Sequence, residues 1–132
     1  NGYCIALSNT NTIEYLSLLS MVPGQSHNNY AIDIPGQIKQ GCAGFALDYL
    51  VEKKVIPQPT HIKIDVDGNE LKVINGMSNL LRNTQLKSIC IELNPDFKEH
   101  FEVLEILKSK FQNYKKHQWY DNQKVFNYIF KR

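Results

Sequence analysis

The chain has 132 residues, a formal net charge of +2 at pH 7 and 42% hydrophobic residues. This length corresponds to one domain, and the apolar content is sufficient for a hydrophobic core. A nearly neutral charge with scattered lysines gives no indication of nucleic-acid binding or of an anionic membrane surface. No apolar stretch approaches the roughly 18 residues of a membrane span, and no signal-peptide pattern is visible.

Cysteine usage favours a reducing compartment. Cys4, Cys42 and Cys90 are odd in number and far apart in the sequence. They show neither the paired spacing of a metal site nor that of a disulfide framework. We therefore expect a cytoplasmic protein without disulfides and without a metal site.

The first half of the chain predicts extended segments followed by one helix. Residues 3–7 and 12–19 favour strands, whereas 32–38 contains a Pro-Gly pair that suits an edge or a loop. Apolar side chains recur at helical spacing over residues 45–54, and the basic end of this segment matches the helix dipole.

The second half predicts alternating strands and helices. Asn94 is the expected N-cap of its second helix, with Pro95 in the first turn. The alternation predicts right-handed crossovers in a single α/β domain, with a mostly parallel sheet that closes in an antiparallel C-terminal hairpin. In chain order, the expected elements are strand 62–66, helix 71–82, strand 86–93, helix 95–111, and strands 118–120 and 125–130.

An acidic turn directly follows the strand at 62–66. It contains Asp65, Asp67 and Glu70, and Glu92 stands at the end of the next strand. Ligand sites in open α/β sheets lie beyond the carboxyl ends of the strands. Carboxylates this close together are costly to pack without a cation, a proton or a ligand. Asp67 and Glu70 also have the spacing of a capping box, whereas Asp65 lies too early to cap the helix.

The residues around this turn resemble the signature of FkbM-type methyltransferases. Residues 62–70 have the sequence Ile-Lys-Ile-Asp-Val-Asp-Gly-Asn-Glu, similar to the family's Ile-Lys-x-Asp-Val-Glu-Gly-x-Glu, and Gly76 follows as in the family. Residues 45–50 are similar to its Thr-Leu-Asp-x-Leu segment, 6–9 to the Ala-Val-Ser-Asp that ends its third strand, and 89–92 to its Ile-x-x-Glu strand. The resemblance covers most of the chain in the right order.

The resemblance implies a Rossmann-like class I fold, S-adenosylmethionine as cofactor, and O-methylation of a sugar or natural-product hydroxyl. The family's glycine-rich first motif and the acidic residue after its second strand do not occur in this sequence. We therefore expect the C-terminal portion of a methyltransferase catalytic domain, with its N-terminal strands missing and weak or no cofactor binding by itself. Asp67 stands where the family usually has Glu, which keeps the charge but shortens the reach.

The resemblance also implies roles for the carboxylates. It places Asp65 beside the methyl-transfer centre, where it would contact the cofactor and orient or deprotonate the acceptor hydroxyl. Asp67, Glu70 and Glu92 would shape or polarise the pocket of a small-molecule or glycan acceptor.

Three other residues complete the predicted site. Ser8 and Asn9 match the end of the family's third strand, so they would help to seat the cofactor. His27 lies in a polar loop that could border the acceptor pocket, where an imidazole can act as a base near neutral pH. The remaining histidines are expected to be structural or exposed, namely His61, His100 and His117.

Two further classes of function fit parts of the sequence. A strand ending in Asp-x-Asp also occurs in nucleotide-sugar glycosyltransferases, where both carboxylates hold a divalent cation under a diphosphate. That pattern leaves Lys63, Glu70 and Gly76 unexplained. The other class is non-catalytic: an incomplete domain that serves only as a scaffold or a partner surface.

Overall fold

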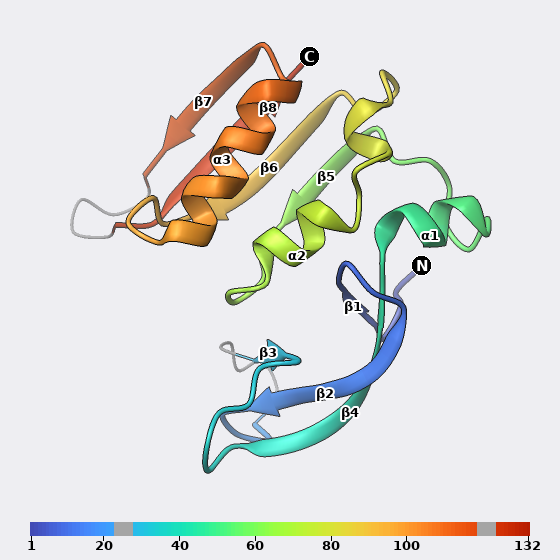
Figure 1. Ribbon diagram of the computed structural model, residues 1–132, viewed down its shortest axis with the longest axis vertical. Coiled ribbons are helices and arrows are strands. Elements are labelled where there is room, and N and C mark those ends of the chain that lie inside the picture. The colour runs from blue at the N-terminus through green and yellow to red at the C-terminus, as the bar shows by residue number, and fades with distance from the viewer. Residues whose placement is uncertain (23–27, 119–123) are drawn as a thin grey trace.

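The computed structural model describes residues 1–22, 28–118 and 124–132, whose strands form two four-stranded sheets (Figure 1). The first sheet consists, in spatial order, of β1 (Ala6–Leu7), β4 (Ile38–Phe45), β2 (Thr12–Leu18) and β3 (Asn29–Tyr30). The second sheet consists of β5 (His61–Ile64), β6 (Ser88–Leu93), β8 (Phe126–Lys131) and β7 (Asn113–His117). The helices are α1 (Leu47–Glu52), α2 (Glu70–Asn75), the 3-10 helix η1 (Leu80–Arg82) and α3 (Lys98–Lys110).

The predicted mostly parallel, Rossmann-like sheet is wrong. Among the described strands, β1–β4 and β5–β6 pair in parallel, whereas the other four pairs are antiparallel. The largest difference comes from β4, which runs antiparallel to β2 over seven register positions. Gly41 and Gly44 lower the strand propensity of this segment, so no strand was predicted over most of it. The long antiparallel ribbon of β2 and β4 therefore makes the first sheet mostly antiparallel.

Several element boundaries also differ from the expectations. The helix predicted over 71–82 ends at Asn75, and only a short 3-10 turn follows at η1. The helix α3 begins at Lys98, because the Asn94 side chain accepts the Asp96 N–H at 3.0 Å and forms a turn before the helix. The antiparallel C-terminal hairpin is confirmed, but β7 ends at His117, and residues 119–120 of the predicted strand lie outside the described residues.

The hydrophobic core lies around the second sheet. Side chains of β6 alternate, so that Ile89, Ile91 and Leu93 are fully buried. The helix α3 lies across this sheet in Figure 1 and contributes Val103 and Leu107 to the same core. A bilayer span needs about 20 apolar residues, and within the described parts of the chain no helix has that combination of length and apolarity.

Close backbone contacts connect the end of α2, which follows the acidic turn, to the first sheet and to α1. Gly76 lies so close to the end of β1 that a Cβ there would be 2.0 Å from the Ser8 carbonyl oxygen. The Asp48 N–H donates to the Gly76 carbonyl at 3.0 Å, and the Asp48 carboxylate accepts the N–H groups of Asn79 and Leu80 at 2.8 and 3.0 Å. These contacts hold the start of α1 against the end of α2 and the start of η1, and they place the end of α2 beside β1.

Candidate functional site

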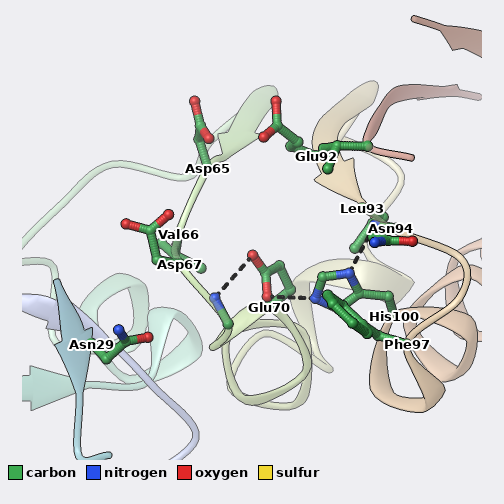
Figure 2. A pocket seen from close by; sticks show the side chains of 12 residues that line it. Asn29, Asp65, Val66, Asp67, Glu70, Glu92, Leu93, Asn94, Phe97 and His100 are labelled. Carbon is green, nitrogen blue, oxygen red and sulfur yellow. Dashed lines mark hydrogen bonds and ion pairs between the residues drawn. The ribbon is translucent and has the colours of Figure 1, made fainter. Parts of the chain in front are cut away.

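A pocket of about 400 Å³ lies at the carboxyl ends of β5 and β6. These strands are adjacent and parallel, so their carboxyl ends meet at one edge of the second sheet. The volume falls in the range of about 300–1,000 Å³ that small-molecule sites have. All four carboxylates predicted from the sequence line this pocket (Figure 2), namely Asp65, Asp67, Glu70 and Glu92.

Glu70 is the most buried of these carboxylates, with 5% of its surface exposed. One oxygen, Oε1, accepts the Gly68 N–H at 3.4 Å, and Oε2 lies 3.1 Å from Nε2 of His100. Gly68 has a φ of +90°, which an L side chain rarely adopts, so a glycine allows the sharp turn into α2. The capping box is wrong, because α2 begins at Glu70 with Asn69 as N-cap and without a side-chain cap. The Glu70 carboxylate is therefore available to the pocket.

His100 is a pocket residue that the sequence analysis missed. Its side chain is 13% exposed, Nδ1 accepts the Asn94 N–H at 2.8 Å, and the Phe97 ring makes an edge contact at 5.4 Å (Figure 2). The turn before α3 folds the first turn of this helix over the carboxyl end of β6. A histidine in the first turn of a helix that follows Glu92 was the available sequence signal.

Asp65 lies at the rim of the pocket. Its side chain is 53% exposed and forms an ion pair with Lys63, whose side chain is 61% exposed. The hydrogen bond from Lys63 to Asp65 raises the pKa of the Lys63 ammonium group above its usual value. Exposed ion pairs contribute only about 0–1 kcal/mol to stability, because water screens them. Lys63 thus has a partner, but Asp65 is more open to solvent than Glu70.

The other two carboxylates occupy separate parts of the lining. Glu92 accepts a hydrogen bond from the Asn127 side-chain amide at 3.3 Å, whereas Asp67 is exposed. In Figure 2 the carboxylates of Asp65 and Asp67 point in different directions. Across residues 1–22, 28–118 and 124–132, no three His, Cys, Asp or Glu side chains converge as metal ligands do.

A second cavity of about 320 Å³ adjoins the pocket and shares Asp65, Val66 and Asp67 with it. Asn69 also lines this cavity; it is 5% exposed, and its Oδ1 has no hydrogen-bond partner in the described part of the chain. A buried polar atom without a partner is costly. The remaining wall is largely apolar and includes Ile5, Ala6, Leu7, Leu16 and Tyr30.

The structure does not bring the other predicted residues into either cavity. Ser8 is 3% exposed, donates its N–H to the Phe45 carbonyl at 2.9 Å and lies 3.4 Å from the Asn9 side-chain oxygen. Neither Ser8 nor Asn9 is among the described residues that line the two cavities. His27 lies outside the described residues, so its predicted role as a base stays a prediction.

Comparison with known proteins identifies the family. Residues 3–116 match the model of the methyltransferase FkbM domain. The chain belongs to this family. A segment of this FkbM-family chain is also 37% identical over 57 residues to the hexuronic acid methyltransferase AglP of Haloferax volcanii; it covers 43% of this chain and 24% of AglP. No solved structure matches the chain. The family that residues 62–70 and Gly76 indicated is therefore confirmed.

Proposed function

We propose that this FkbM-family chain transfers a methyl group from S-adenosylmethionine to a hydroxyl oxygen of a sugar or natural product. The observation that carries the proposal is Glu70, a buried carboxylate directed into a pocket at the ends of two parallel strands. The family assignment supports methyl transfer and leaves the glycosyltransferase alternative without support.

Glu70 is the carboxylate best suited to act as the general base. Methylation of a hydroxyl forms an O–C bond and breaks the C–S bond of the donor, and the hydroxyl proton must leave. Glu70 can accept that proton on a carboxylate oxygen that water hardly reaches. A positioned general base contributes about 10²- to 10⁴-fold to a rate, and proximity of the reactants contributes further. Asp65, Asp67 and Glu92 would then shape and polarise the pocket.

The second cavity has features that fit the adenosyl part of S-adenosylmethionine. Its apolar wall suits an aromatic base, and the unpartnered Oδ1 of Asn69 can accept a hydrogen bond from an amino group. When bound, the cofactor supplies an electrophilic methyl group. Asn69, Leu7 and Val66 would hold it, and Ser8 would act indirectly by keeping Leu7 in the cavity wall.

The charge of the pocket favours a neutral acceptor. Four carboxylates line it, and neither Lys nor Arg is among the described residues of the lining. A carboxylate-bearing acceptor would therefore meet like charges, which disfavour its binding. Phe97 is 58% exposed at the same pocket and offers a flat apolar surface for the C–H face of a sugar ring. A neutral sugar hydroxyl satisfies both features.

The proposal is tested on the full-length protein with methyl-labelled S-adenosylmethionine. Calorimetry should detect cofactor binding, and the label should appear on methyl glucoside as an alkali-stable ether rather than on glucuronic acid. Label on glucuronic acid as an alkali-labile ester would contradict the proposed acceptor class. Absence of cofactor binding would contradict methyl transfer and support the non-catalytic alternative.

A further inference from the structure

His100 and Glu70 form a hydrogen-bonded pair that joins α3 to α2 across the pocket. Which atom donates in this pair can be inferred from the contact that the imidazole ring makes through its other nitrogen, Nδ1. The Asn94 N–H can only donate, so Nδ1, at 2.8 Å, carries no proton. A neutral imidazole with an unprotonated Nδ1 has its proton on Nε2. Nε2 therefore donates to Oε2 of Glu70 at 3.1 Å.

The ring of His100 is fixed on several sides. Asn94, its backbone partner, immediately follows β6, which ends at Leu93. The Phe97 ring contacts the imidazole at an interplanar angle of 77°. With 13% of its side chain exposed, His100 has little freedom to turn away. The Nε2–H donor is thus held in place relative to the strand end.

This donor restricts the orientation of Glu70. A second hydrogen bond to the carboxylate, from the Gly68 N–H to Oε1, is long at 3.4 Å. The hydrogen bond from His100 is shorter and comes from a fixed ring, so it determines which way the carboxylate faces. A proton relay through His100 is excluded in this arrangement, because Nδ1 already accepts the Asn94 N–H. A proton taken up from an acceptor would therefore remain on Glu70 during the transfer instead of passing through the ring.

We infer that His100 is a positioning residue that orients the Glu70 carboxylate toward the acceptor through its Nε2–H. This inference rests on the proposed function, since it assigns His100 a role in the same transfer. It extends the site to a residue on α3 that holds the base in place. Loss of the outer residues that orient metal ligands typically costs about 10- to 100-fold in activity, and we expect a loss of similar size for a residue that orients a general base.

Two matched variants separate the two sides of the ring. His100→Gln places an amide N–H near the position of Nε2, so it keeps the donor to Glu70 and loses the acceptor for Asn94. His100→Asn places an amide oxygen near the position of Nδ1, so it keeps the acceptor for Asn94 and loses the donor. In the full-length protein, with methyl glucoside as acceptor, we expect kcat to fall about 10- to 100-fold in His100→Asn, with a small change in KM. His100→Gln should restore most of kcat.

The outcomes distinguish the inference from the proposed function. If the wild-type protein transfers no methyl group to any acceptor, the proposed function fails and this inference fails with it. If the wild type is active but both variants lose kcat equally, the inference alone is overturned. Nitrogen-15 NMR of the wild-type imidazole adds a test that needs no variant to fold. It should show a neutral ring protonated on Nε2, and a ring protonated on Nδ1 would overturn the inference.

Discussion

The two sheets of this protein differ in what they contribute. The buried members of the core cluster all lie between Leu47 and Phe130, in the second sheet, in the helices around it and in the segments that connect them. The first sheet contributes few buried side chains, and Ile13 and Ile38 are 79% and 48% exposed there. The pocket that contains Glu70 lies at the end of the second, packed sheet and takes only Asn29 of β3 from the first, thinner sheet. The adjoining cavity is lined by residues of all four strands of this thin sheet. The proposed base Glu70 is therefore held beside a well-packed core, whereas a thinner layer borders the second cavity.

The largest effect is expected at the packed sheet, for Glu70→Gln. This change keeps the shape and the hydrogen bond from His100 but removes the base, so kcat should fall about 10²- to 10⁴-fold. The measurement is kcat of the full-length protein at saturating S-adenosylmethionine and acceptor, with thermal unfolding as a control for the fold.

Asp65→Asn is the matched comparison for Glu70→Gln. Asp65 is half-exposed and paired with Lys63, so its loss should reduce kcat by less than about tenfold. If kcat falls as much in Asp65→Asn as in Glu70→Gln, Asp65 rather than Glu70 would have to be assigned as the base.

Substitution of a glycine in each region shows how much stability is lost when a Cβ atom is added there. In Gly76→Ala the new Cβ would meet the Ser8 backbone at 2.0 Å, and overpacking of this kind costs about 1–3 kcal/mol of unfolding free energy. In Gly44→Ala the Cβ would meet the Tyr30 hydroxyl oxygen at 2.1 Å and the ring atoms Cζ and Cε1 at 2.4 and 2.8 Å, so the ring of this buried tyrosine has to shift. The clash is with a side chain rather than with backbone, and the shift breaks the hydrogen bond from Tyr30 to the Thr12 carbonyl, so the cost should lie at the lower end of that range, about 1 kcal/mol. Urea denaturation measures both, and a larger loss for Gly44→Ala would reverse the comparison.

Substitution of Asp48 tests whether its carboxylate stabilises the fold. Asp48→Ala removes the acceptor of two N–H groups at the start of η1, which should lower the unfolding free energy by about 0.5–2 kcal/mol. Glu52→Ala serves as control, because Glu52 is exposed and should change stability by less than about 0.5 kcal/mol. Equal effects of the two variants in urea denaturation would remove the capping role of Asp48.

The smallest effects come from one substitution made in both sheets. Ile91→Val removes a methyl group from a fully buried side chain in β6, at a cost of about 0.5–1.5 kcal/mol. Ile13→Val removes the same group from a side chain that is 79% exposed in β2, at a cost below about 0.5 kcal/mol. Similar costs in chemical denaturation would show that Ile13 is covered in solution.

The two sheets also differ in how well the sequence predicts them. In the packed sheet, the apolar runs of β5 and β6 predicted both strands. The carboxylates at and after the ends of these strands predicted the pocket. In the thin sheet, Gly41 and Gly44 hid the strand β4, and with it the antiparallel topology. Local patterns carried the predictions that succeeded.

His100 was missed for a different physical reason. Its partner Glu70 lies 30 residues earlier, and their contact depends on the turn at Asn94 that folds α3 over β6. No spacing within one element reveals such a pair. The predicted capping box of Asp67 and Glu70 was also wrong. Gly68 has a positive φ, so the chain turns there and α2 begins only at Glu70.

The most direct test of the proposed site is the position of the acceptor in a complex. The full-length protein would be crystallised with S-adenosylhomocysteine and the acceptor that the transfer assay identifies. We predict that the reacting hydroxyl oxygen lies about 2.6–3.2 Å from a Glu70 carboxylate oxygen. A hydroxyl bonded to Asp65 instead, or an acceptor outside the pocket of β5 and β6, would contradict it.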